Sequence, residues 1–417
     1  MNGSILITGG RLLDPHQDRL GPPTDLLIEG GEVRAIGPRI GNAEGAVRID
    51  ASGLTVMPGM IDAHVHIFMN ERNIAAGAEV PQTYAAAKSG FVLGQMLQRG
   101  WTTVRDVAGG DYGMRDAVAA GYLQAPRLFI GGKAISQTGG HGDFRGRAES
   151  GYECACCTGR ALFSTLADGV PEVIKATREQ LRLGADHVKI MLSGGVASPN
   201  DPLDSIQYRI DEIAACVEEA GRWGSYVCAH AYSDEAIRRG ILNGVRTIEH
   251  GNFVGPETAA MMAERGAFVV PTLIVHEANE RLGGPAAGKS PAAMQKNERV
   301  RQGGLKALGV YKEAGVQIGY GSDLSMHTQQ FQNEGLAFHA TALSNADVIR
   351  SATLVNARIV KRERLLGELV PGAIADLLLV DGDPYRDLSV LVNHGEKILA
   401  IMQAGVFVKR LPPQPVH

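Results

Sequence analysis

Short apolar runs alternate with helical segments through the middle of the chain, between about residues 58 and 360. Helical patterns cover 210–223, 233–243 and 256–265. Eight apolar runs predict β-strands, over residues 59–67, 102–107, 127–131, 187–192, 226–231, 246–250, 268–272 and 317–322. Repeated strand–helix alternation predicts an α/β fold, and it favours a closed parallel (β/α)8 barrel, a TIM barrel, over an open doubly wound sheet.

Both ends of the chain have a different texture, in which short strands alternate with glycine turns. Strands are predicted over 4–8, 25–29, 33–36 and 47–50 at one end, and over 375–380, 397–403 and 406–409 at the other. Neither end has enough strands for a stable sheet, so we expect the two ends to pair. The sequence therefore predicts a small β-sandwich domain from residues 1–57 and 361–417, with the barrel over 58–360.

Two connections after predicted strands are unusually long. Residues 132–170 are rich in Gly and polar residues, and residues 276–304 are rich in Ala, Gly and Lys. Long insertions on barrels commonly form lids or walls of the substrate site. The alternative is a solvated or disordered excursion, which we favour for 283–300.

Composition is that of an ordinary enzyme, since 44% of the 417 residues are hydrophobic and 21% are charged. A net charge of −4 gives no basic face for nucleic acid. Apolar runs stay shorter than the roughly 18 residues that span a bilayer, so no membrane association is expected. The first residues resemble a β-strand more than a signal peptide.

Five cysteines are too few and too unevenly placed for a disulfide framework, so we expect a reducing cytoplasm. Cys216 and Cys228 fall in apolar segments and are predicted to be core residues. A Cys154-x-Cys156-Cys157 cluster lacks the second ligand pair of a zinc ribbon, which makes a soft-metal site there the weaker interpretation.

Six polar residues stand at the ends of the apolar runs, where the strands of a barrel converge. They are His64, His66, Lys189, His230, His250 and Asp323. His64 and His66 are two residues apart on one strand, so their imidazoles face the same side. One histidine alone is more often structural than a metal ligand, but His230 and His250 on neighbouring strands favour a metal site.

Lys189 lies in an apolar strand, where an uncompensated ammonium is costly. Two interpretations are open. The amine is carbamylated by carbon dioxide and bridges two metals, or it is paired with Asp106 or Asp323 at the barrel mouth. Asp323 could bind metal, accept a proton from water and pass it to a leaving group, while its alternative role is to cap a helix.

These motifs together resemble the amidohydrolase superfamily, in its binuclear form with a carbamylated lysine. The matching residues are Pro58-Gly59-x-x-Asp62-x-His64-x-His66, Lys189, His230, His250 and Gly321-Ser322-Asp323. The segments 189–199, 229–232 and 249–251 are similar to the prolidase-like (Xaa-Pro dipeptidase) branch.

That resemblance implies a site with two divalent metal ions. His64, His66 and Asp323 would hold one metal, and His230 and His250 would hold the other. A carbamate on Lys189, derived from carbon dioxide, would bridge them. Zinc is the metal that this ligand set favours, and a hydroxide between the metals would be the nucleophile.

Further site residues are predicted beside these ligands. Tyr232 and His141 could hydrogen-bond the carbonyl oxygen as it becomes an oxyanion, although His141 could equally lie in a surface loop. The backbone of Gly194, Gly195 and Val196 could cradle a substrate carboxylate, or the glycines could only permit a tight turn. Arg105 could contact substrate or pair with Asp106 at the rim, and His327 is expected to line the pocket.

We therefore predict a metal-dependent hydrolase of amide bonds. The preferred substrate is an Xaa-Pro or related dipeptide or an N-acyl amino acid, and the partner is a small molecule. A cyclic-amide hydrolase of the imidazolonepropionase kind, or a deaminase with one metal, is the second hypothesis. A non-catalytic scaffold is the third, since relatives that became scaffolds usually lose ligands. A homo-oligomer is expected, as for many soluble enzymes.

Overall fold

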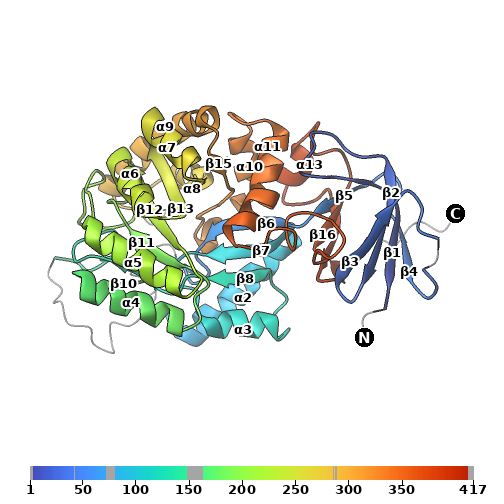
Figure 1. The fold of residues 1–417 in the computed structure, drawn as a ribbon, viewed down its shortest axis with the longest axis horizontal. Helices are drawn as coiled ribbons and strands as arrows, with labels where there is room; N and C mark the ends of the chain where they lie inside the picture. Colours follow the sequence, from blue (N-terminus) through green and yellow to red (C-terminus); the bar gives the residue numbers. More distant parts are fainter. Residues whose placement is uncertain are drawn as a thin grey trace.

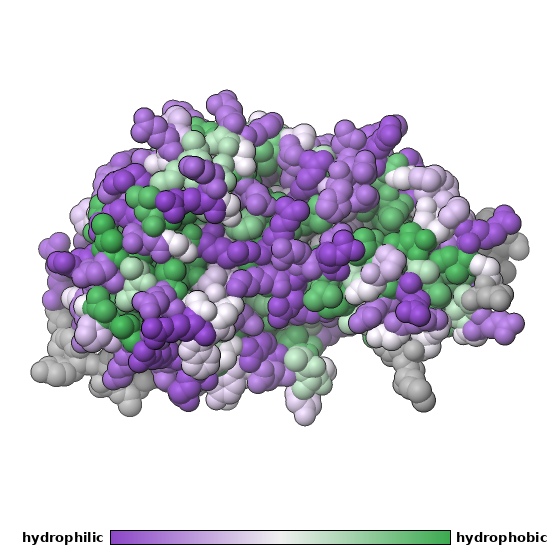
Figure 2. Space-filling view, viewed as in Figure 1, coloured by the Kyte–Doolittle hydropathy of each residue, from purple (hydrophilic) through white to green (hydrophobic). Residues whose placement is uncertain are grey.

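An α/β body and a separate β-sheet at one end make up the molecule (Figure 1). The computed structural model describes residues 3–41, 43–71, 80–147, 163–284, 286 and 289–411. Cys154, Cys156 and Cys157 lie outside the described residues. Polar side chains cover most of the face shown in Figure 2, and smaller apolar patches lie between them. Within the described residues, no helix is long and apolar enough to cross a membrane.

Strands from the two ends of the chain share one sheet, in the order β18-β17-β16-β5-β1-β2-β3, with β4 paired to β1. The strands are β1 (Ile5–Leu12), β2 (Pro23–Glu29), β3 (Glu32–Gly37), β4 (Val47–Asp50), β5 (Thr55–Pro58), β16 (Leu377–Val380), β17 (Ile398–Gln403) and β18 (Val406–Lys409). Antiparallel pairing of β5 with β16 joins the two ends.

This sheet differs from the expected sandwich, because all eight strands belong to one hydrogen-bonded network. The reason lies in β1. Its first half pairs with β4, and after a register shift between Ile7 and Gly10 its second half pairs with β5. One bent strand therefore serves both parts of the domain.

The α/β body contains two parallel sheets, which confirms the predicted class. The first comprises β6 (Met60–Val65), β7 (Trp101–Asp106) and β8 (Arg127–Ile130). The second has the order β10-β9-β11-β12-β13-β14-β15. Its strands are β9 (Ala134–Ser136), β10 (Ser164–Leu166), β11 (Val188–Met191), β12 (Val227–Ser233), β13 (Thr247–Phe253), β14 (Phe268–Val270) and β15 (Gln317–Ile318).

Backbone hydrogen bonds connect the two parallel sheets at both edges. At one edge, Asp186 N donates to Ile130 O across 2.8 Å. At the other, Ala63 N donates to Tyr320 O (2.9 Å) and Asp323 N donates to His64 O (2.8 Å). The last strand is shorter than expected, but the chain that follows it still runs beside β6. That contact brings Asp323 next to His64.

Helices follow most of the parallel strands and carry the apolar faces that cover them. They are α2 (Gln82–Gln98), α3 (Tyr112–Ala119), α4 (Val170–Arg182), α5 (Ile210–Arg222), α6 (Asp234–Leu242), α7 (Pro256–Glu264), α8 (Leu273–Leu282), α9 (Pro291–Ala314), α10 (Glu334–His339), α11 (Asn345–Arg350), α12 (Asn356–Ile359) and α13 (Ser389–Val392). A 3-10 turn, η3 (Met326–Phe331), and a π-helical turn, η4 (Ser351–Val355), complete the body. Cys216 and Cys228 are buried and free, as core residues are.

The expectation of a long loop over 276–304 is wrong, because α8 and α9 occupy most of it. The local signals for α9 were present in the sequence. Ser290 caps the helix by accepting a hydrogen bond from Ala293 N, and Pro291 follows at the first helical position. Alanine, lysine and glutamine then favour helix, so a polar composition here did not mean disorder. Within 132–170 the chain forms β9 and β10, and 148–162 lies outside the described residues.

Asn356 stabilises the contact between β6 and the chain after β15, where the two parallel sheets meet. Its buried amide donates to Ile61 O (2.6 Å) and to Tyr320 O (2.8 Å). Asn356→Ala should lower the free energy of unfolding by about 2–3 kcal/mol in urea denaturation, because buried acceptors lose their donor. Gln98→Ala is the control, since its exposed bond to Val408 O (3.3 Å) should contribute less than about 0.5 kcal/mol. Equal losses in the two variants would contradict this account.

Candidate metal centre

All six residues predicted at the strand ends line one cavity, whose empty volume is about 830 Å³. His64 is the last residue but one of β6 and His66 directly follows the strand, while Lys189, His230 and His250 come from β11, β12 and β13. Asp323 lies beyond β15. Residues separated by more than two hundred and fifty positions therefore face one space, as converging parallel strands require.

Asp323 lies at the centre of the imidazoles. Its Oδ1 is 3.4 Å from His64 Nε2 and 3.2 Å from His66 Nε2, and its Oδ2 is 3.9 Å from His250 Nδ1. His64, His250 and Asp323 offer ligand atoms that all lie within 4.8 Å of one another. The ring of His230 is centred 4.6 Å from that of His250. Nitrogen and carboxylate donors at this spacing fit divalent metal ions.

Each of the four histidines has one ring nitrogen held by a neighbour. His64 Nδ1 contacts Glu249 Oε2 (2.7 Å), and His66 Nδ1 contacts Ala108 O (2.9 Å). His230 Nε2 contacts Gly194 O (3.1 Å), and His250 Nδ1 contacts Thr272 Oγ1 (2.7 Å). Outer contacts of this kind fix the ring orientation and leave the other nitrogen available, as in metal sites.

Protonation at this site also suits metal binding. Burial, reinforced by neighbouring positive charge, lowers the pKa of His230 and His250 well below the usual value of 6.5. Both imidazoles are then neutral, which is the form that binds metal. Burial alone would raise the pKa of Asp323, but the charge of His64 and the hydrogen bonds of His64 and His66 hold it well below 3.8.

Lys189 is only 2% exposed and sits in the wall of this cavity. Of the two interpretations open from the sequence, ion pairing finds no support in the described part of the chain. Neither Asp106 nor Asp323 comes within 4.0 Å of its ammonium there. Asp106 instead accepts hydrogen bonds from Ile67 N (2.6 Å) and Gly110 N (2.8 Å).

Arg105 does not reach the cavity, so the expected substrate contact needs correction. Its side chain is completely buried and donates to Glu249 Oε1 (2.7 Å), Ala63 O (2.5 Å) and Thr247 Oγ1 (3.3 Å). Arg105 points inward from β7, since alternate residues of a strand face opposite sides. Burial raises the pKa of Glu249, but the charge of Arg105 and the hydrogen bond from His64 together hold it well below 4.5.

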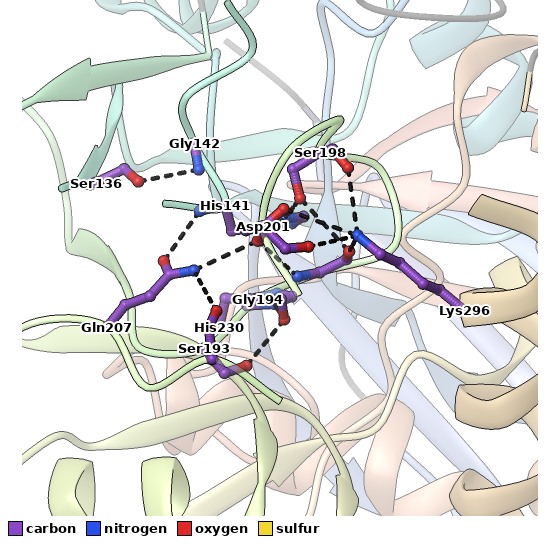
Figure 3. Close-up of polar contacts among 12 residues, drawn as sticks. Ser136, His141, Gly142, Ser193, Gly194, Ser198, Asp201, Gln207, His230 and Lys296 are labelled. Carbon is purple, nitrogen blue, oxygen red and sulfur yellow. Dashed lines mark hydrogen bonds and ion pairs between the residues drawn. The ribbon is translucent and has the colours of Figure 1, made fainter. Parts of the chain in front are cut away.

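The Gly194–Gly195 backbone does not cradle an anion either. Gly194 N donates to Ser205 O (3.1 Å) and Gly195 N donates to Asp201 Oδ2 (3.0 Å), so both N–H groups are already used. A Cβ at Gly195 would collide with the His141 ring, which explains the glycine. Figure 3 shows the same segment held by Lys296, whose Nζ donates to Asp201 O (2.7 Å) and Gly195 O (3.0 Å). Val196 does line the cavity.

His141 and Tyr232 both line the cavity beside the histidine ligands. The His141 ring stacks on His230 at 4.1 Å, and its Nδ1 contacts Ser198 Oγ at 2.8 Å. Burial lowers the pKa of His141 to about 4, so the ring is neutral. Burial raises the pKa of Tyr232 well above 10, so its hydroxyl keeps its proton. His327 is not among the lining residues, and its Nδ1 contacts Ser325 Oγ (3.1 Å).

Three residues at this site have strained backbone conformations. His250, Thr272 and Asp323 have positive φ angles of 76°, 46° and 54°. Left-handed backbone at non-glycine residues costs on the order of 1 kcal/mol each and persists only where the surroundings impose it. The strain turns the chain at the end of each strand, where these side chains meet.

Several neighbours of the site were not predicted from the sequence. They are Glu249, Ser198, Asp201, Gln207, Lys296, His276, Asn279 and Lys289. Glu249 carried a usable signal, because a carboxylate inside an apolar strand needs a partner. The others lie on connections, where spacing alone does not place a side chain.

Comparisons with known proteins agree with this geometry. The model of the amidohydrolase family matches residues 55–408. Ochratoxinase from Aspergillus niger is 29% identical over 356 residues, which cover 80% of this chain and 72% of that protein. A prolidase solved with N-methylphosphonate-L-proline is 42% identical, with a TM-score of 0.95, covering 98% of this chain and 100% of the other. A Xaa-Pro dipeptidase with bound methionine is 28% identical, with a TM-score of 0.88 and the same coverage.

Glu249 controls which nitrogen of His64 is free. The carboxylate accepts the Nδ1 proton, which leaves Nε2 directed toward Asp323 and able to bind a metal once it carries no proton. In Glu249→Gln an amide N–H turned toward Nδ1 would place the imidazole proton on Nε2. Zinc affinity, measured by chelator competition, should fall about 10- to 100-fold. Glu257→Gln, at an exposed position of α7, is the matched control. Wild-type affinity in Glu249→Gln would contradict this role.

Proposed function

Because the chain belongs to the amidohydrolase family, we propose that it hydrolyses an amide bond with the help of two divalent metal ions, preferably zinc. His64, His66 and Asp323 would hold one ion, and His230 and His250 the other. Lys189, carbamylated, would bridge them. We also infer that eight of the ten strands in the two parallel sheets, β6 to β8 and β11 to β15, form the closed barrel that the sequence predicts.

One observation carries this proposal. Four imidazoles, each held by a neighbour through one ring nitrogen, line the same cavity as the Asp323 carboxylate and the buried Lys189, which has no counterion among the described residues. A buried amine that lacks a partner is costly as a cation. Conversion to a carbamate removes that cost and supplies the negative charge that two dications require. No other use of Lys189 accounts as well for its burial among ligands.

Metal ions in such a site lower the pKa of bound water and polarise the substrate carbonyl. The chain's own groups do the rest. Asp323, whose pKa is held well below 3.8, is ionised and can accept a proton from water and deliver it to the leaving amine. The protonated Tyr232 hydroxyl can donate to the carbonyl oxygen as negative charge develops. His141 can donate from Nε2 when Ser198 donates to its Nδ1.

The substrate we propose is an Xaa-Pro or related dipeptide or an N-acyl amino acid. Similarity to a prolidase, to a Xaa-Pro dipeptidase and to ochratoxinase supports a linear amide over a cyclic one. Apolar side chains in the cavity, among them Phe144, Phe163, Val196 and Val275, suit an apolar substrate residue. Turnover of a panel of dipeptides and N-acyl amino acids, with zinc and bicarbonate supplied, tests the proposal.

Metal content separates this site from that of a one-metal deaminase or cyclic-amide hydrolase. Elemental analysis of the purified protein after dialysis with bicarbonate should give about two metal ions per chain. Lys189→Ala should lose at least one of them and most of the activity, because the bridge is gone. Lys175→Ala, an exposed residue of α4, should keep both. One ion per wild-type chain would rule out a bridging Lys189.

Asp323 should matter more for turnover than for metal retention. Asp323→Asn keeps a ligand oxygen but cannot carry a proton, so kcat should fall about 100- to 10,000-fold. Metal content by elemental analysis should remain near that of the wild type. Asp211→Asn, at the exposed start of α5, is the control for a carboxylate-to-amide change. Near-native turnover by a metal-replete Asp323→Asn variant would refute the proton-transfer role.

A further inference from the structure

We propose that Lys289 binds a free carboxylate of the substrate, which restricts this cavity to amides that also carry a free carboxylate, such as N-acyl amino acids and dipeptides. This inference rests on the proposed amide hydrolase function and narrows its substrate class. It concerns a cation that lies outside the predicted metal centre, on the connection between α8 and α9.

Lys289 has a fixed backbone position at the cavity wall. Its N–H donates to Gly284 O across 2.8 Å, which closes the turn after α8. The next residue, Ser290, caps α9. The Lys289 side chain lines the same cavity as Asp323 and the histidines. The hydrogen bond to Gly284 and the start of α9 therefore position the Lys289 backbone beside the cavity.

Two lysines and no arginine are found among the described residues that line the cavity. Lys189 comes from β11, whereas Lys289 comes from the connection between α8 and α9. In the described part of the chain, the Lys289 ammonium has no hydrogen bond and no carboxylate within 4.0 Å. Burial lowers the pKa of Lys289, and the charge of Asp323 only partly opposes this. Lys289 is only partly exposed, and an anionic ligand group would give its ammonium the partner that it lacks among the described residues.

Other groups that could hold a carboxylate are engaged elsewhere. The N–H groups of Gly194 and Gly195 already bond Ser205 and Asp201. Asn279 directs its amide N–H toward Asn297 Oδ1 (3.4 Å). Among the described lining residues, Lys289 is therefore the one cation to which the proposed metal site gives no role.

His276 also lines the cavity, but it presents a hydrogen-bond acceptor and therefore does not suit a carboxylate. Asn297 donates from Nδ2 to His276 O (3.0 Å), so its Oδ1 must accept the proton of His276 Nδ1 (3.0 Å). Burial lowers the pKa of His276, and the neutral ring then carries a lone pair on Nε2, which is buried without a partner among the described residues. That atom accepts hydrogen bonds and repels a carboxylate. It suits an N–H of the substrate instead.

The test compares a substrate with its carboxamide, which keeps the shape and removes the charge. L-alanyl-L-proline and N-acetyl-L-phenylalanine are assayed beside their C-terminal carboxamides with the zinc-loaded enzyme. Wild-type kcat/KM should favour the acids by about 10- to 100-fold. Lys289→Met should lose that preference, mainly through a higher KM for the acids, while Lys289→Arg should retain part of it. Lys306→Met, at an exposed position of α9, should behave as the wild type.

The outcomes separate this inference from the function on which it rests. Equal kcat/KM for acid and carboxamide in the wild type, or an undiminished acid preference in Lys289→Met, would overturn the role of Lys289 and leave the hydrolase intact. Equal loss on acid and carboxamide in Lys289→Met would also overturn it, since a fold defect acts on both. Absence of turnover on every acid and carboxamide would overturn the proposed function and this inference together.

Discussion

The ion pair between Arg105 and Glu249 is the interaction on which the site depends. Both side chains are fully buried, and they join β7 to β13 inside the parallel body. Removing two charges from water costs several kcal/mol per ion, which only a complete set of hydrogen bonds offsets. Arg105 has three such partners, and the second oxygen of Glu249 holds His64. The ion pair is therefore better explained by the orientation that it gives His64 than by a gain in folding stability. A hydrophobic pair could fill the same space without the free-energy cost of desolvating two charges.

Asp62 plays the corresponding part on the other side of His64. This buried carboxylate accepts hydrogen bonds from His64 N (3.1 Å), Ser322 N (3.0 Å) and Gln332 Nε2 (2.9 Å). Burial raises the pKa of Asp62, and the bonds from Ser322 and Gln332 counteract that rise. Asp62 thus links the backbone of His64 to that of Ser322, the neighbour of Asp323. The side chains of His64 and Asp323 meet in the cavity. A short last strand suffices because Asp62 fixes the chain after it.

The sequence predicted side chains on strands better than side chains on the connections between strands. The meeting of the six side chains at strand ends in one cavity follows from the sequence, because the period of a strand and the convergence of parallel strands determine where those side chains point. Arg105 was misplaced, since its position next to Asp106 at the end of β7 did not reveal that it faces inward toward Glu249. The Gly194–Gly195 segment was misread for a related reason. Its N–H groups are consumed by Ser205 and Asp201, partners that only the folded connection brings near. The span 276–304 was taken for a loop although Ser290 and Pro291 marked the start of a helix.

The same division explains why the reaction class is easier to infer than the substrate. The proposed metal ligands lie on or directly after strands whose geometry leaves little freedom, so their residue types and spacing form a motif. Lys289, His276 and Asn279 sit on α8 and on the turn before α9, where a small change in length would move each of them without disturbing the strands. Chemistry held by the sheet can thus stay constant while the connections alter what is recognised. In this chain the connection brings to the cavity one cation and one acceptor that have no partner among the described residues, Lys289 Nζ and His276 Nε2, and their opposite demands on a ligand are more specific than the apolar walls around them.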